Sequence, residues 1–384
     1  MKEIILLGAT GSIGTQTLEI IRSYPTEFKL KAISVGTNLN KAKEIIEEFK
    51  PEMVSIKAKE DSIELSKDYP STTFVSGLEG MVEVATIDKE NKNITLVVAV
   101  VGSVGLMPTL EAIKIGRNIA LANKETLVVG GEIVMDLARK NNVTIFPIDS
   151  EHSAIYQSLV GENFDDIQKI IITASGGALR DYSREELVNV TKEIALKHPN
   201  WAMGAKITID SATMMNKGFE VIEAHHLFGV DYQNIETIIH KESIIHSLVE
   251  FKDSSVKAQL GVSDMRLPIL YALSYPKRFA YNNKLNLLEK PLTFEKMDFD
   301  RFPCLAMAYE AAKNGNIFPT VLNVSNDCAV KLFLEDKIPF LMIEQIIREA
   351  LDETVFVEKL SLDIILEVEK NLKNKILTKY ERGI

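Results

Sequence analysis

Two acidic residues, Asp149 and Glu151, stand two positions apart directly after the apolar run 144–148. Such a run is typical of a buried strand, and ligands of an open α/β sheet bind at the carboxyl ends of its strands. Residues two apart in extended backbone point to the same side, so we expect the carboxylates to converge. Converging carboxylates need a shared proton or cation, and their oxygens favour Mg²⁺ or Mn²⁺. The alternative is an ordinary polar loop, or a helix N-cap in which Ser150 or Glu151 satisfies backbone N–H groups.

A third acid, Glu220, closes a segment of small polar residues that begins at Asp210. Within this segment, Ser211, Asn216 and Lys217 combine neutral donors with one cation, as an oxyanion or phosphate pocket does. Glu220 follows Asn216 and Lys217 by about one helical turn, which would let it reach a metal from that side. Taken alone, Lys217 is better explained as a solvated surface lysine.

Asn123, Lys124 and Glu125 follow another strand-like run, 119–121. A lysine at such a sheet edge can approach a substrate carbonyl or hydroxyl. The alternative is a capping cluster at the start of a helix.

Ser175 begins a Ser-Gly-Gly turn after the run 167–173. This turn resembles a phosphate-contacting turn more than the nucleophile elbow of a hydrolase. The segment 198–204 contains Trp201, the single tryptophan of the chain, together with Met203. A proline and a glycine bracket this pair, which suits a lid that closes over a small ligand. The alternative is a loop whose tryptophan packs on the core.

The glycine-rich segment 8–14 has the spacing G-x-x-G-x-x-G and links the first strand-like run to the first helix-like stretch. Its glycines permit a tight turn and let backbone N–H groups approach a pyrophosphate at the helix N-terminus. A plain strand-to-helix turn is the alternative, but the βα series that follows favours a dinucleotide site. The second strand ends at 34–41 without the acid that holds the ribose of NAD, so NADP is favoured.

Around these clusters, short apolar runs alternate with amphipathic stretches through the first 150 residues. This alternation predicts βαβ units and a mostly parallel sheet. The strand-like runs are 4–7, 32–35, 54–56, 96–101, 119–121 and 144–148, and the helix-like stretches are 15–23, 41–49, 107–115 and 127–140.

The pattern changes beyond residue 149. Strand-like runs at 167–173, 235–239, 244–251 and 256–260, with a long helix or helix pair at 206–228, predict an α+β region with its own sheet. Helix-like stretches at 305–313, 321–334, 343–351 and 360–377 predict a small C-terminal bundle. We expect an α/β protein with a Rossmann-like NADPH-binding domain at 1–149, a catalytic α+β domain at 150–279, a linker at 280–303 and a helical domain at 304–384.

The composition excludes several classes of protein. With 54 acidic and 44 basic residues, the net charge of −10 argues against a general nucleic-acid binder, which needs a basic face. Cys304 and Cys328 lie far apart and outside any C-x-x-C, which argues against a disulfide framework. The N-terminus lacks signal-peptide features, and no run approaches the roughly 18 apolar residues of a membrane span. We expect a cytoplasmic protein with no membrane or nucleic-acid partner.

Taken together and in this order, the segments resemble the 1-deoxy-D-xylulose 5-phosphate reductoisomerase family over essentially the whole chain. The resemblance rests on the segments 8–14, 122–125, 149–152, 175–177, 198–204 and 210–218. It implies NADPH, Mg²⁺ or Mn²⁺, a small phosphorylated sugar as substrate, and a homodimer formed by the central domain.

The resemblance also implies a role for each matching position. NADPH contacts are implied for Thr10, Gly11, Ser12, Ile13, Gly36, Asn38, Asn123, Glu125 and Gly204. The implied metal ligands are Asp149, Glu151 and Glu220, which with Lys124 make up the catalytic set. Substrate contacts are implied for Lys124, Ser150, Glu151 and Glu220 near the reacting carbons, and for Ser175, His198, Ser211, Asn216 and Lys217 at the phosphate. Trp201 and Met203 would belong to a lid.

The implied activity is the metal-dependent rearrangement of 1-deoxy-D-xylulose 5-phosphate, followed by reduction with NADPH to 2-C-methyl-D-erythritol 4-phosphate, in the non-mevalonate isoprenoid route. Two alternatives remain open. One is another NADP-dependent dehydrogenase of a small phosphorylated substrate, although simple hydride transfer needs no metal. The other is a non-catalytic NADPH sensor, which would have no reason to combine Lys124 with three acids.

Overall fold

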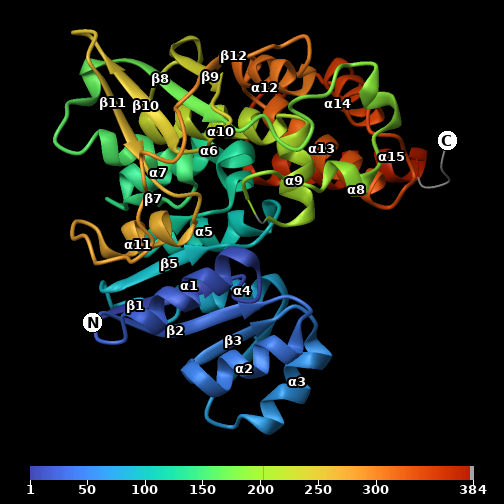
Figure 1. The fold of residues 1–384 in the computed structure, drawn as a ribbon. Coiled ribbons are helices and arrows are strands. Elements are labelled where there is room, and N and C mark those ends of the chain that lie inside the picture. The colour runs from blue at the N-terminus through green and yellow to red at the C-terminus, as the bar shows by residue number, and fades with distance from the viewer. Residues whose placement is uncertain (202, 381–384) are drawn as a thin grey trace. The chain divides into compact units, whose positions relative to one another are not determined.

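The computed structural model describes residues 1–201 and 203–380. Residue 202 of the predicted lid segment and residues 381–384 of the predicted helical domain lie outside the described residues. The chain divides into two compact units, described separately below (Figure 1). Unit 1 contains Met1–Thr126, Val134–Ser153 and Asp264–Asn282, and unit 2 contains Leu127–Ile133, Ala154–Ser263 and Asn283–Ile384.

Unit 1 is built on a seven-stranded parallel sheet with the order β4-β3-β2-β1-β5-β6-β7. This is the doubly wound order of a Rossmann fold, with β4 added at one edge. The order reverses between β1 and β5, which is the point where ligands bind in such sheets. The strands are β1 (Lys2–Leu7), β2 (Phe28–Val35), β3 (Met53–Ile56), β4 (Thr73–Ser76), β5 (Ile94–Val98), β6 (Asn118–Leu121) and β7 (Ile145–Pro147).

Two pairs of helices pack against this sheet, α1 beside α11 and α4 beside α5 (Figure 1). The strands read as nearly continuous buried runs, as expected for parallel strands covered on both faces. The helices are α1 (Ser12–Ser23), α2 (Leu39–Phe49), α3 (Lys59–Asp68), α4 (Gly77–Thr86), α5 (Leu106–Lys114) and α11 (Arg266–Ser274); α6 (Lys124–Lys140) and α7 (Ser150–Ser158) have residues in both units.

Unit 2 contains a five-stranded sheet of order β11-β10-β8-β9-β12, in which only the β8–β9 pair is parallel. Apolar residues of α7 and α10 pack with those of β8, β9 and β10 in one core cluster. The strands are β8 (Ile167–Ala174), β9 (Ile235–Ile239), β10 (Ile245–Phe251), β11 (Val256–Leu260) and β12 (Glu295–Lys296).

The remaining helices of unit 2 form a second core, in which α13 contacts α12, α14, α15 and α9. In Figure 1 the orange and red helices α12 to α15 gather beside the green α8 and α9. The helices are α8 (Lys192–Ala195), α9 (Ala205–Ala212), α10 (Met215–Phe228), α12 (Pro303–Asn314), α13 (Phe318–Leu334), α14 (Met342–Asp352) and α15 (Leu362–Tyr380).

The predicted α/β fold class, with its Rossmann-like sheet and C-terminal helices, is confirmed. One strand boundary was wrong, since the run predicted at 96–101 ends as a strand at Val98. The carbonyl groups of Val100 and Gly102 beyond it accept from the Asn123 side chain instead of from a strand. The predicted domain boundaries stay predictions. Among the described residues, no helix is both long and apolar enough to span a membrane.

Candidate functional site

The glycine segment forms a turn that side chains could not fit. Gly8 has φ +83°, and a Cβ placed on it would lie 2.5 Å from Ala99 O. A Cβ on Gly14 would lie 2.2 Å from Gly8 O, so the first turn of α1 packs directly on the loop. No side chain caps α1 at Gly11, which leaves backbone N–H groups of its first turn for a ligand. This geometry fits a pyrophosphate at the helix N-terminus.

Asn123 organises the loop that faces the glycine turn across the β1–β5 switch point. Its side-chain amide donates to Val100 O and Gly102 O, each at 3.0 Å, and to Glu125 Oε2 at 2.7 Å. Asn123 and Glu125 are both buried. Asn123 therefore shapes the loop at the predicted nucleotide site through its hydrogen bonds.

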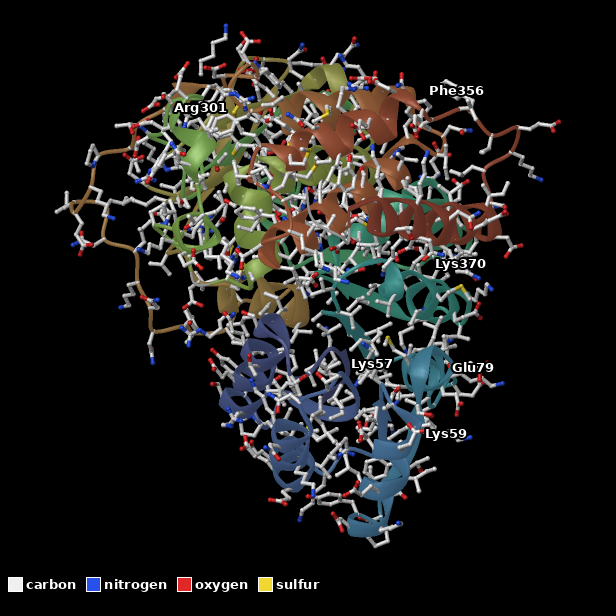
Figure 2. The ribbon with its side chains drawn as sticks, turned by 90° about the vertical axis from the view of Figure 1, so that its right-hand side faces the viewer. Lys57, Lys59, Glu79, Arg301, Phe356 and Lys370 are labelled. Atoms are coloured by element: carbon white, nitrogen blue, oxygen red, sulfur yellow. The ribbon has the colours of Figure 1, made fainter. Side chains whose placement is uncertain are left out.

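The end of β2 carries Gly36 and Asn38, and no acid. Asn38 caps α2 by accepting from the Lys41 N–H at 3.1 Å. On the neighbouring strand, Ile56 of β3 pairs with Val35 of β2, so Lys57 and Gly36 leave adjacent strands at the same edge. Figure 2 labels Lys57 and its neighbour Lys59 on the blue N-terminal unit, where both side chains are exposed. A cation at this edge suits a ribose that carries a phosphate.

Asp149 and Glu151 lie directly after β7 at the carboxyl edge of the same sheet. Their carboxylates offer oxygen atoms within 4.8 Å of each other. Lys124, the first residue of α6, forms an ion pair with Asp149 Oδ2, and Ser150 Oγ donates to Glu151 Oε2 at 2.5 Å. His152, which is fully buried, places Nδ1 3.5 Å from Asp149 Oδ1. An oxygen-rich pair of this kind fits a hard divalent cation.

The extended backbone expected for this pair was wrong. Helix α7 begins at Ser150, and Asp149 Oδ1 accepts from the Glu151 N–H at 3.2 Å. Asp149 is therefore the capping residue, rather than Ser150 or Glu151, because a short acidic side chain satisfies the free N–H groups of a first turn. The positive end of the helix dipole also favours carboxylates at these positions.

Glu220 lies in unit 2 on α10, one turn after Asn216 and Lys217. Asn216 Nδ2 donates to Glu220 Oε1 at 2.6 Å, and Lys217 Nζ forms an ion pair with Glu220 Oε2. Lys217 and Glu220 are both buried, so the interpretation of Lys217 as a surface lysine was wrong. A buried charge pair of this kind is stable only with further hydrogen bonds, and Asn216 supplies one.

Ser175, directly after β8, contacts His198 in unit 2. His198 Nδ1 accepts from the N–H groups of Asn200 at 3.2 Å and Trp201 at 3.0 Å. A ring nitrogen that accepts twice carries no proton, so Nε2–H donates to Ser175 Oγ at 3.1 Å. The same oxygen accepts from the Gly177 N–H at 3.2 Å. The Ser175 hydroxyl therefore has its own hydrogen to donate to a ligand oxygen.

Burial, with a smaller contribution from nearby Arg180, lowers the pKa of His198 to about 4. His198 is therefore neutral near pH 7, as its two accepted hydrogen bonds require. Arg180 itself donates to Ser175 O at 3.4 Å and to Lys241 O at 3.2 Å. The arginine thus holds the turn without being part of the predicted site.

The loop after His198 is tied down by Asn200, whose amide donates to Lys241 O at 2.7 Å and to Ser243 Oγ at 2.8 Å. The Trp201 ring lies 6.1 Å from the ring of His246, and its side chain is half-buried. Met203 is also half-buried, whereas Gly204 is exposed at the N-cap of α9. The role of Trp201 and Met203 as a lid stays a prediction.

Ser211 lies next to the Ser-Gly-Gly turn, on the last turn of α9. Gly177 has φ +71°, and a Cβ on it would lie 2.5 Å from Ser211 O. The turn therefore packs against the end of α9 with no room for a side chain. Asn216 and Lys217 lie on the helix that follows, α10.

Models of the 1-deoxy-D-xylulose 5-phosphate reductoisomerase family match residues 4–131, 145–228 and 260–375, the second and third as its C-terminal domains. Proteins named 1-deoxy-D-xylulose 5-phosphate reductoisomerase from Bacillus cereus and Geobacillus are 53% identical over 381 residues and 54% identical over 380 residues. Each alignment covers 98% of this chain and 99% of the relative. The chain belongs to the 1-deoxy-D-xylulose 5-phosphate reductoisomerase family.

Solved structures of the reductoisomerase family agree with the fold. A DOX-P reductoisomerase in complex with NADPH, fosmidomycin and magnesium has a TM-score of 0.93 at 38% identity, covering 99% of this chain and 98% of that one. The Zymomonas mobilis enzyme in complex with NADPH has a TM-score of 0.91 at 36% identity, with 99% of both chains covered.

Three polar residues of this reductoisomerase-family chain were not singled out from the sequence. Lys57 could have been found as a cation directly after the strand that neighbours β2. Asn200 lies inside the predicted lid segment, but its two partners near residue 242 are distant in sequence. Asp210 opens the phosphate segment, yet only packing reveals that it is buried.

Proposed function

We propose that this chain catalyses the NADPH- and divalent-metal-dependent rearrangement and reduction of 1-deoxy-D-xylulose 5-phosphate to 2-C-methyl-D-erythritol 4-phosphate. The observation that carries the proposal is the match of nearly the whole chain to proteins named for this activity. The sites described above supply the chemistry that the reaction needs: a dinucleotide cradle, a carboxylate pair beside a buried lysine, and a pocket of small donors with one cation.

The nucleotide would lie across the β1–β5 switch point of unit 1. Backbone N–H groups of Ser12 and Ile13 would hold its pyrophosphate, with Gly11 and the Thr10 side chain in contact with it. Gly36 and Asn38 would meet the ribose, and Lys57 would add positive charge for a 2′-phosphate. When bound, NADPH supplies the hydride for the reductive step.

The rest of the predicted nucleotide contacts are assigned to Asn123, Glu125 and Gly204. Besides its predicted contact with the nucleotide, Asn123 holds the loop 99–102 in place through its hydrogen bonds. The nucleotide would contact this loop. Glu125 accepts from Asn123 and fixes the orientation of that amide.

Asp149, Glu151 and Glu220 would each give one oxygen to a single Mg²⁺ or Mn²⁺. Three carboxylates and no sulfur or imidazole make a donor set suited to these ions. When bound, the ion supplies a Lewis acid for two neighbouring oxygens of the substrate. Asn216 and Lys217 keep the Glu220 carboxylate in place, and Lys124 does the same for Asp149.

The side chains near the carboxylates would orient the substrate. The Lys124 ammonium would stabilise negative charge that develops on a substrate oxygen, and Ser150 and Glu151 would contact oxygens near the reacting carbons. The phosphate would be held by Ser175, His198, Ser211, Asn216 and Lys217. Binding of this remote group orients the rest of the substrate, and Trp201 and Met203 would exclude water from the aldehyde formed by rearrangement.

The proposal is tested by incubating the protein with NADPH, Mg²⁺ and 1-deoxy-D-xylulose 5-phosphate and identifying the product by NMR. We expect 2-C-methyl-D-erythritol 4-phosphate in amounts equal to the NADPH consumed. NADPH oxidation with other phosphorylated substrates but not this one would indicate a different dehydrogenase. Tight NADPH binding with no oxidation of any substrate would indicate a sensor.

We further propose a homodimer formed through unit 2. Leu287, Leu288 and Phe294 are exposed in the segment that contains β12, and Leu288 is 95% exposed. Apolar side chains gathered at a surface mark an interaction site, and sedimentation would show twice the monomer mass. A cytoplasmic location stays a prediction; Cys304 and Cys328 are both buried and unpaired, as suits a reducing compartment.

A further inference from the structure

The phosphate pocket proposed above depends on two segments of unit 2 that contain little regular structure. Ser175 lies in a tight turn, and Ser211 lies on α9, which has eight residues. Helices this short are marginal without tertiary contacts. Both segments contact the C-terminal helices, which carry none of the predicted site residues.

The first contact is behind Ser211, at its neighbour Asp210. Asn326 on α13 donates through Nδ2 to Asp210 Oδ1 at 2.7 Å, and Lys206 donates to Asp210 Oδ2 at 2.9 Å. Lys206 also pairs with Asp327 of α13 at 3.0 Å. Asp210 is 3% exposed and Asn326 is fully buried. A buried carboxylate without donors is costly, so Asn326 and Lys206 stabilise α9 in this position.

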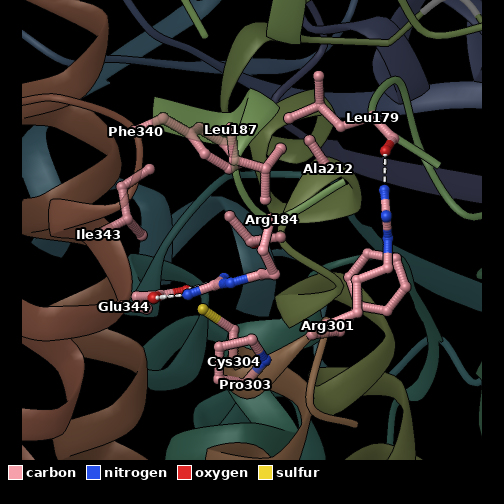
Figure 3. Close-up of a pocket in the computed structure, with 12 residues that line it drawn as sticks. Leu179, Arg184, Leu187, Ala212, Arg301, Pro303, Cys304, Phe340, Ile343 and Glu344 are labelled. Carbon is pink, nitrogen blue, oxygen red and sulfur yellow. Dashed lines mark hydrogen bonds and ion pairs between the residues drawn. The ribbon is translucent and has the colours of Figure 1, made fainter. Parts of the chain in front are cut away.

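The second contact is behind the Ser-Gly-Gly turn. Arg301, two residues before α12, donates to the carbonyl oxygen of Leu179, as the dashed line in Figure 3 shows. In the same view, Arg184 forms a two-pronged ion pair with Glu344 of α14, at 2.9 and 2.5 Å. The cavity between these pairs has a volume of about 20 Å³, roughly room for one water molecule.

We infer that the C-terminal helices position the phosphate-binding residues, with Asn326 acting on Ser211 through Asp210 and Arg301 acting on Ser175 through Leu179. The inference rests on the proposed phosphate pocket. Asn326 and Arg301 are positioning residues, because they touch Asp210 and Leu179 rather than the ligand. A shift of α9 would move Ser211 and, through the close contact at Gly177, the Ser175 turn as well.

The test replaces Asn326 by leucine, which has a similar size and no donor. For Asn326→Leu we expect the KM for 1-deoxy-D-xylulose 5-phosphate to rise about tenfold, since a charge-assisted hydrogen bond of this kind is lost. The KM for NADPH should rise far less, because every proposed nucleotide contact except Gly204, at the N-cap of α9, lies in unit 1. In the Asn326→Asp variant two carboxylates would face each other, so its defect should be at least as large as that of Asn326→Leu.

The matched control is Arg348→Gln, which breaks an ion pair with Glu310 between α14 and α12. This variant should lose stability in thermal melts without a change in either KM. A second readout that does not depend on turnover is titration with inorganic phosphate, followed by the fluorescence of Trp201. Phosphate should bind more weakly to Asn326→Leu and equally well to Arg348→Gln.

The outcomes separate the inference from the proposed function. An unaltered protein that does not turn over the substrate would contradict the proposed function, and phosphate titration would still test the inference. An unchanged substrate KM and phosphate affinity in a folded Asn326→Leu variant would overturn the inference. Should Asn326→Leu fail to fold, the substrate KM and the phosphate affinity are measured in Arg301→Met instead. This variant removes the hydrogen bond to Leu179, and unchanged values in it would overturn the inference.

Discussion

The proposed nucleotide cradle of unit 1 and the proposed phosphate pocket of unit 2 are built in opposite ways. The cradle is one contiguous segment, 8–14, whose shape is set by backbone at Gly8 and Gly14. The proposed pocket draws its side chains from the turn at Ser175, the loop at His198 and the helix pair α9–α10, which contact a further set of helices. A site formed by the backbone of one segment depends on the space around a few glycines. A site formed by side chains from several segments depends on the contacts that support those segments.

The largest expected effect comes from Asp149→Asn, at the carboxylate pair of unit 1. Asparagine caps a helix as well as aspartate does, so α7 should remain intact while the charge that a divalent ion needs is lost. We expect metal-dependent turnover to fall by about 100-fold or more and the affinity for NADPH to stay the same. Calorimetric titration with NADPH and a rate assay on one preparation would measure both. Unchanged turnover would remove Asp149 from the metal site.

Gly14→Ala tests whether the cradle depends on the close approach of α1 to the backbone of the glycine turn. The added Cβ would lie 2.2 Å from Gly8 O, and overpacking of this kind costs about 1–3 kcal/mol. The melting temperature should fall and NADPH should bind more weakly. Gly36→Ala is the matched variant for stability, because no atom lies within 4 Å of the added Cβ. Equal melting temperatures for the two variants would show that the close contact is not a constraint.

A smaller effect is expected from Lys57→Gln, which removes the cation beside Gly36. The affinity for NADPH should fall about tenfold, and that for NADH should hardly change, because only NADPH carries the 2′-phosphate. Lys92→Gln is the control, since Lys92 donates to Ile115 O near the amino ends of β5 and β6. A parallel loss for both nucleotides would assign Lys57 a role in folding rather than in discrimination.

The smallest effect is the pH response of the loop at His198. Its pKa is lowered to about 4 in the fold from 6.5, so between these values the unfolded chain binds more protons. The stability that His198 contributes is therefore complete above pH 6.5 and is lost as the pH falls towards 4. Protonated Nδ1 cannot accept from Asn200 and Trp201, so the emission of the single tryptophan in the folded protein should shift as the pH falls through about 4. An identical titration in His198→Gln would contradict this assignment.

The same contrast explains how much could be predicted from the sequence. The cradle, the parallel sheet and the C-terminal helices follow from contiguous patterns of glycine spacing and apolar periodicity. The helix start at Ser150 was missed because an acid after a strand is compatible with both extended backbone and a cap. The bond between His198 and Ser175, and that between Asn326 and Asp210, join residues 23 and 116 positions apart, and only packing in the fold brings such pairs together.

Asp149, Glu151 and Glu220 are proposed to bind one catalytic cation. The most direct measurement is electron paramagnetic resonance of Mn²⁺ titrated into the protein, with turnover recorded on the same samples. We predict one Mn²⁺ per chain, activity that rises with its occupancy, and loss of both in Asp149→Asn and in Glu220→Gln. Full activity without a bound divalent ion, or one tightly bound Mn²⁺ that survives both substitutions, would contradict it.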